Sequence, residues 1–132
     1  MGIYLNPDHM EFQEALNSKI YVDKSEMIGI TNRLIRTEQK YICTSRPRRF
    51  GKSMAANMLA AYYSRGCDSG ELFQNLKISS DPAYEKHLNK YNVIRLNMTD
   101  FLARGNTIQE MLDYLRRRLL HELKKSFKDV DC

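Results

Sequence analysis

One short basic segment, residues 46–53, constrains the fold of this 132-residue chain more than any other feature. It reads Arg-Pro-Arg-Arg-Phe-Gly-Lys-Ser and follows a β-rich run at residues 40–45. Pro47 lacks the N–H that a strand ladder needs, so the chain must leave any strand at this point. A helix rich in apolar residues is predicted to begin near Gly51 or Lys52. A strand, a glycine-containing loop and a helix in this order are the setting in which a phosphate-binding loop forms.

The remainder of the chain predicts an alternation of helices and strands. Residues 93–98 form a second β-rich run, and residues 20–22 are a shorter extended candidate. Alternation of this kind favours an α/β fold with a parallel sheet. Three helices are expected in the first half of the chain: around residues 11–16, from Asp23 or Ser25 to about residue 37, and from residue 51 or 52 to Gly66. A short helical turn is expected over residues 70–76 and a helix over residues 81–88. A last helix is expected to follow a capping box formed by Thr107 and Glu110.

Composition sets limits on the class of protein. The chain is 42% hydrophobic and 28% charged, as in a folded domain, and its apolar runs are too short to span a bilayer. The N-terminus has no signal-peptide pattern, so a cytoplasmic location without a membrane partner is expected. The three cysteines, Cys43, Cys67 and Cys132, form no C-x-x-C pair and have no histidine cluster beside them, which argues against a zinc site.

The basic segment offers the groups that a nucleoside triphosphate needs. Gly51 lets the backbone approach phosphates closely, Lys52 would reach the outer phosphates, and the Ser53 hydroxyl would bind magnesium. Arg46 stands where the general pattern G-x-x-x-x-G-K-[S/T] has its first glycine, so the match is incomplete. We predict a site for ATP with Mg²⁺, with Lys52 as its catalytic residue and Ser53 as its metal ligand. The predicted binding residues are Arg46, Pro47, Arg48, Arg49, Phe50, Gly51, Lys52, Ser53 and Met54.

Simpler interpretations stand beside these assignments. The segment alone also fits a solvated basic turn before a helix. Arg48 and Arg49 have two functional interpretations, contact with phosphate or action on a neighbouring subunit. Their simpler interpretation is that they form salt bridges or face solvent. Phe50 fits a core anchor better than a stacking partner for adenine. Asp23 fits a helix cap better than a residue beside the nucleotide.

The same residues resemble a known family. The loop is similar to the R-P-R-R-F-G-K-S loop of the bacterial AAA-ATPase-like family, in which the first glycine is normally replaced. Three further segments resemble that family's landmarks, and the resemblance runs from about Phe12 to Phe101. It implies the three-layer α/β/α fold of P-loop NTPases, ATP hydrolysis that drives a conformational change, and homo-oligomers of the complete protein. The landmark segments are Tyr21-Val22-Asp23-Lys24-Ser25, Glu71-Leu72-Phe73 and Val93-Ile94-Arg95-Leu96.

The resemblance also implies a later Walker B strand, whose acidic residues hold magnesium and prepare water. No apolar strand ending in Asp-Glu follows residues 93–98, because Asn97 and Thr99 interrupt the pattern before Asp100. We therefore expect residues 1–132 to be the N-terminal part of a P-loop domain with an incomplete sheet. Many relatives also carry a C-terminal nuclease-like domain. Residues 1–132 alone would bind nucleotide weakly and hydrolyse it poorly.

A hypothesis from another class uses the charge of the chain, which is +5 overall. Positive residues gather in the basic segment and in the last predicted helix. A basic nucleic-acid-binding module without nucleotide chemistry would use that helix, although a solvated charged face is its commoner explanation. A truncated product without activity is a third interpretation. The basic residues of the last helix are Arg116, Arg117, Arg118, Lys124, Lys125 and Lys128.

Overall fold

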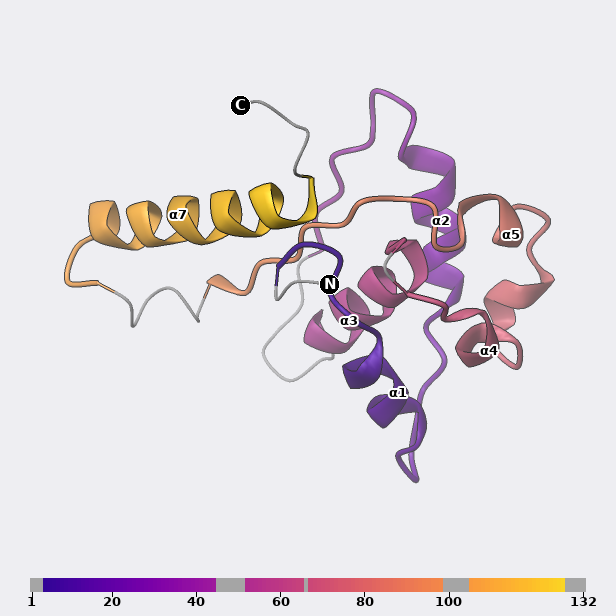
Figure 1. Cartoon of the computed structure of the whole chain (residues 1–132). Coiled ribbons are helices and arrows are strands. Elements are labelled where there is room, and N and C mark those ends of the chain that lie inside the picture. The colour runs from indigo at the N-terminus through magenta and orange to yellow at the C-terminus, as the bar shows by residue number, and fades with distance from the viewer. Residues whose placement is uncertain (1–3, 45–51, 66, 99–104, 128–132) are drawn as a thin grey trace.

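The computed structural model describes residues 4–44, 52–65, 67–98 and 105–127, and within them the chain is helical (Figure 1). The long elements are α2, α3 and α7, and shorter helices connect them. The bounds are α1 Met10–Leu16, α2 Glu26–Leu34, α3 Lys52–Tyr63, α4 Gly70–Phe73, the 3₁₀ helix η1 Lys77–Ser80, α5 Tyr84–His87 and α7 Ile108–Ser126. Each corresponds to a helix or turn that the sequence predicts, except that η1 lies between two predicted elements.

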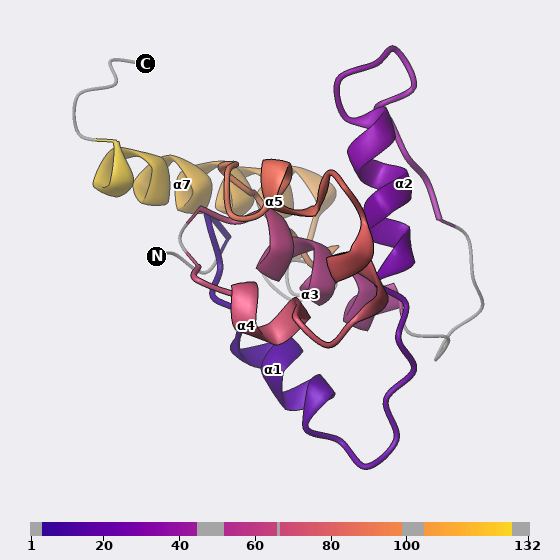
Figure 2. The same ribbon diagram turned by 90° about the vertical axis from the view of Figure 1, so that its right-hand side faces the viewer.

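The core forms where α1, α2, α4 and η1 pack around α3 (Figure 2). Phe12 of α1 stacks on Phe73 of α4, with ring centroids 5.0 Å apart, and Tyr62 of α3 meets Phe73 edge-on at 5.6 Å. Each fully buried side chain of this kind contributes roughly 1.5–3 kcal/mol. The buried cluster consists of Phe12, Ile28, Met58, Ala61, Tyr62, Phe73 and Ile78.

Asn89 closes the C-terminal end of α3. Its backbone N–H donates to the Tyr62 carbonyl at 2.7 Å, and its side-chain amide donates to the carbonyls of Ala61 and Ser64 at 3.1 and 2.8 Å. Its side-chain oxygen accepts from the Ser69 N–H at 3.2 Å. Asn89 has a φ of 54°, a left-handed conformation that asparagine tolerates better than most residues. Asn89 therefore supplies donors to the carbonyls at the end of α3 and joins α3 to α4.

The prediction of a parallel α/β sheet, and with it the three-layer P-loop NTPase fold, is wrong for the described residues. Residues 41–44 form no strand there and are exposed, and Tyr41 retains 86% of its surface. In the second run, Ile94 makes an isolated antiparallel bridge to Leu5, and just before the run Tyr91 makes an isolated parallel bridge to Ser64. Residues 20–22 are likewise without a strand. β-rich composition describes how side chains fit a sheet that already exists, and the described chain gives these runs no ladder of partners.

The last helix, α7, begins at the predicted capping box. The Thr107 hydroxyl accepts from the Glu110 N–H at 3.2 Å, and the Glu110 carboxylate accepts from the Asn106 N–H at 2.7 Å. Near its other end, the buried carboxylate of Glu122 accepts from the backbone N–H groups of Tyr4 and Leu5, both at 3.0 Å. No helix in the described residues is long and apolar enough to cross a membrane.

Candidate functional site

The predicted nucleotide site lies at the start of α3. Residues 46–51, which include Arg46, Pro47, Arg48, Arg49, Phe50 and Gly51, lie outside the described residues. Lys52 is the first residue of α3, as the sequence predicts, and Ser53 and Met54 follow on its first turn. Both of these side chains are exposed, and Met54 keeps 46% of its surface. Further along α3, Met58 and Tyr62 are buried.

The first turn of α3 differs in charge from the other described α-helices. It contains no acidic residue, whereas each of the others has a glutamate there. An acidic side chain normally offsets the partial positive charge of a helix N-terminus and pairs with its free N–H groups. Within α3 itself no first-turn carboxylate offsets that positive charge, and the exposed Ser53 lies on the same turn. This charge pattern suits an anion better than it suits a cation.

Asp23 and Ser25, within one of the landmark segments, hold α2 against η1. The Asp23 carboxylate accepts from the N–H groups of Ser25 and Lys77, both at 2.8 Å. The fully buried Ser25 hydroxyl accepts from the Ile78 N–H at 3.1 Å. Ser25 is the N-cap of α2 but makes no side-chain capping bond to it. Asp23 therefore has a structural role, but the prediction that it caps the helix is wrong, because its carboxylate joins the segment before α2 to η1 and the N-cap is Ser25.

These contacts set the acidity of Asp23. Partial burial raises its pKa, but hydrogen bonds from Ser25 and Lys77, with the positive charge of Lys77, outweigh burial and hold the pKa below its ordinary value of 3.8. A carboxylate with a lowered pKa stabilises the fold above its unfolded-state pKa. That stabilisation is lost as the pH falls through the folded-state pKa.

Asp23→Asn should therefore destabilise the chain at pH 7 by about 1 kcal/mol, because it removes a charge-assisted acceptor for two N–H groups. The difference from the wild type should close as the pH falls below 3.8. Urea unfolding at several pH values measures this. Asp68→Asn, at an exposed position, is the matched control and should leave stability unchanged. A difference that persists at low pH would contradict the role of the Asp23 charge.

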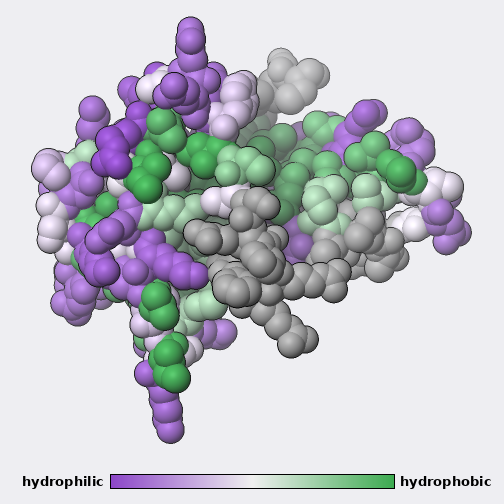
Figure 3. Space-filling model, turned by 180° about the vertical axis from the view of Figure 1, so that it is seen from behind, coloured by the Kyte–Doolittle hydropathy of each residue, from purple (hydrophilic) through white to green (hydrophobic). Residues whose placement is uncertain are grey.

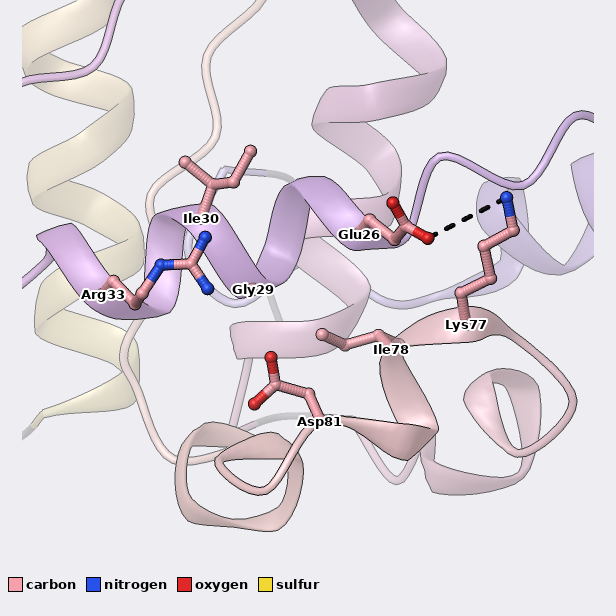
Figure 4. Close-up of a pocket in the computed structure, with 7 residues that line it drawn as sticks. All are labelled: Glu26, Gly29, Ile30, Arg33, Lys77, Ile78 and Asp81. Atoms are coloured by element: carbon pink, nitrogen blue, oxygen red, sulfur yellow. Dashed lines mark ion pairs between the residues drawn. The ribbon is translucent and has the colours of Figure 1, made fainter.

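A hollow of about 300 Å³ lies between α2 and η1 (Figure 4). Buried Gly29 and Ile78 line it together with four charged side chains and Ile30. The ammonium of Lys77 lies 3.9 Å from the carboxylate of Glu26, but both side chains are largely exposed, so this ion pair contributes little stability. The lining residues are Glu26, Gly29, Ile30, Arg33, Lys77, Ile78 and Asp81.

Gly29 keeps this hollow open. A Cβ atom at Gly29 would lie 3.0 Å from an Asp81 carboxylate oxygen and 4.0 Å from an Arg33 guanidinium nitrogen. The other Asp81 oxygen accepts from the Ala83 N–H at 2.8 Å. The hollow therefore presents opposite charges side by side at the surface. This arrangement suits small polar groups and favours neither a cationic nor an anionic ligand. Within the described ranges no cluster of histidine, cysteine and acidic residues could hold a metal ion.

Sequence reasoning did not find this hollow. Its residues come from α2 and η1, which are separated by more than forty positions in the chain, and no short motif spans that distance. The basic residues of α7 were predicted as a surface. The structure bears this out for Arg116, Arg117, Lys124 and Lys125, which are exposed, while Arg118 is half-buried and Lys128 lies outside the described ranges.

A family model described as a predicted AAA-ATPase matches residues 9–131, nearly the whole chain. That description places the chain among proteins expected to act on ATP. The chain belongs to this AAA-ATPase-like family, which confirms the resemblance seen in its sequence landmarks. No curated protein and no solved structure gives a significant match.

Proposed function

We propose that the chain binds Mg-ATP through residues 46–53, with the phosphates held at the N-terminus of α3. The observation that carries this proposal is the charge of that helix end: α3 begins at Lys52 and has no acidic residue in its first turn. Membership of a family of predicted ATPases supports ATP as the ligand. Free N–H groups and an uncompensated positive end attract phosphate oxygens.

Each residue of the segment has a separate task in this proposal. Gly51 permits close approach of the backbone to the phosphates, and the Lys52 ammonium neutralises charge on the outer phosphates. Ser53, exposed on the first turn, supplies its hydroxyl to Mg²⁺. Arg46, Arg48 and Arg49 add positive charge that raises the local concentration of the anionic ligand.

We propose that hydrolysis needs more than the segment at residues 46–53. Attack on the terminal phosphate needs a carboxylate to orient water and to help hold magnesium, and a P-loop alone provides neither. We propose residues 1–132 as the nucleotide-binding part of the family's ATPase domain. Binding without turnover is then the expected behaviour of this chain.

Ser53→Ala tests the magnesium role. The variant should bind ATP alone as the wild type does, but it should lose the gain in affinity that Mg²⁺ gives the wild type. Calorimetric titration of ATP with and without Mg²⁺ measures both quantities. Ser126→Ala, at an exposed position at the end of α7, is the control. If Ser53→Ala retains the full magnesium effect, the hydroxyl is not a metal ligand.

The competing hypothesis of a nucleic-acid-binding module makes a distinct prediction. Binding to DNA or RNA through α7 would weaken steeply with salt and would not depend on Lys52. The exposed Arg116 and Arg117 would then be the sensitive positions. Titrating the same protein with an oligonucleotide and with ATP separates the two functions directly.

A further inference from the structure

One helix stands apart from the core and leaves an apolar stripe uncovered. The N-terminal part of α7 extends away from the other helices (Figure 1). Figure 3 shows hydrophobic residues gathered along this arm. Ile108 keeps 74% of its surface exposed and Leu112 keeps 43%, while Leu115 and Leu119 are half-buried. We propose that α7 is a docking helix for a partner helix whose own apolar stripe is bordered by acidic residues.

The spacing of the apolar residues suits a paired helix. Positions 108, 112, 115 and 119 follow one another at intervals of four, three and four residues, the alternation with which two helices bury a common seam. The next position in this pattern is Glu122, whose buried carboxylate accepts from the N–H groups of Tyr4 and Leu5. The seam is therefore anchored to the body of the protein at its C-terminal end and is open at its N-terminal end.

The residues that border the seam decide what can cover it. At 100° per residue, Gln109, Arg116 and Leu123 fall on one side of it, and Met111, Arg118 and Lys125 fall on the other. No acidic residue lies on either border, because Glu110 and Asp113 fall on the opposite face of the helix. Arg116 and Lys125 are exposed, and Arg118 is half-buried.

This charge pattern selects the partner. In paired helices the border positions form ion pairs that set partner choice. A second copy of α7 would place basic and neutral borders against one another in either orientation, which is unfavourable or neutral. A helix with glutamate or aspartate at its borders would meet Arg116 on one side and Arg118 on the other where it covers Leu115. Beside Ile108 it would meet only the neutral Gln109 and Met111. Nucleic acid would use the positive charge without the apolar seam, whereas an anionic membrane would use both, so vesicles serve as a competing ligand in the test.

The test uses the complete chain and three labelled helical peptides of equal length. One peptide has a leucine seam with glutamate borders, the second has the same seam with lysine borders, and the third has glutamate borders with serine in the seam. Fluorescence anisotropy should show binding of the first peptide and binding at least about tenfold weaker for the other two. Equal binding of the first two peptides, or no binding of the first, would overturn the proposal.

Variants of the chain make the test sharper. Ile108→Ser with Leu112→Ser should abolish binding of the glutamate-bordered peptide, whereas Ile20→Ser with Val22→Ser, at exposed apolar positions elsewhere, should not. Arg116→Glu with Arg118→Glu should exchange the preference between the glutamate-bordered and lysine-bordered peptides. All of these side chains except half-buried Arg118 are exposed, and far-UV circular dichroism checks that each variant is folded.

Other occupants would give different results. Sedimentation would show whether the chain self-associates. Self-association that is lost when Ile108 and Leu112 are both replaced by serine would assign the seam to a second copy and overturn the proposal. Tight binding to oligonucleotide or to vesicles of anionic lipid, with no peptide binding, would also overturn it. An exchange of peptide preference in the charge-reversed variant would establish the proposal, because a non-specific apolar contact does not depend on the charges at the borders of the peptide.

Discussion

Lys52→Ala should lower the affinity of the chain for Mg-ATP by about ten- to 150-fold. This range corresponds to the loss of one charge-assisted contact, roughly 1.5–3 kcal/mol. Lys52 is the first residue of α3, and the first N–H groups of a helix have no partner within the helix. Calorimetric titration of wild type and variant under identical salt conditions measures the change.

The control for this prediction is Lys90→Ala. Lys90 is exposed and outside the described helices, and its removal changes the net charge by the same amount. Affinity for Mg-ATP should therefore stay within about twofold of the wild type, because the remaining effect is only long-range and screened by salt. Equal losses in the two variants would show that net charge, and not a local contact, controls binding. No loss in either would remove Lys52 from the site.

The second large effect should appear in stability. Asn89→Ala should lower the free energy of unfolding by about 2–4 kcal/mol, since two side-chain hydrogen bonds to carbonyls at the end of α3 are lost and alanine is strained at a positive φ. The Ala61 and Ser64 carbonyls then keep only the Ser69 hydroxyl and the Cys67 N–H as donors. Urea unfolding followed by circular dichroism measures the change. Asn89→Gly should cost less, because glycine adopts this backbone conformation freely while losing the same side-chain bonds.

Asn75→Ala is the matched control for that series. Asn75 is exposed, and its substitution should change the free energy of unfolding by less than about 0.5 kcal/mol. If Asn89→Ala behaves like this control, Asn89 does not hold α3 and α4 together. If glycine and alanine at position 89 destabilise equally, the side-chain bonds account for the effect and the backbone conformation does not.

The helices could be read from the sequence because their signals are local. The capping residues Thr107 and Glu110 predicted the start of α7, and the apolar run after Lys52 predicted α3 and its burial. Both signals depend on residues within a few positions of one another. The sheet could not be predicted in this way, because a strand depends on partners that a single run does not contain. Tyr41 lies in a β-rich run that was predicted to be a strand, yet its side chain is exposed.

The contacts between distant segments were also beyond sequence reasoning. Glu122 looks like any polar residue of an amphipathic helix, yet its carboxylate is buried against the N–H groups of Tyr4 and Leu5. Asp23 was recognised as part of a landmark segment, but its contact with Lys77 joins positions 54 apart. Such a pairing leaves no pattern in one sequence. The basic segment at residues 46–53 is the opposite case, since its chemistry is local and its residue types suffice to propose a ligand.

The most direct test of ATP binding at the start of α3 is to map the site by nuclear magnetic resonance. Backbone amide shifts of the complete chain would be followed while Mg-ATP is added. We predict that the largest shifts fall on residues 46–54, that those of Gly51, Lys52 and Ser53 are prominent, and that they disappear in Lys52→Ala. Shifts confined to α7 or to the hollow between α2 and η1, with residues 46–54 unchanged, would contradict the proposed function.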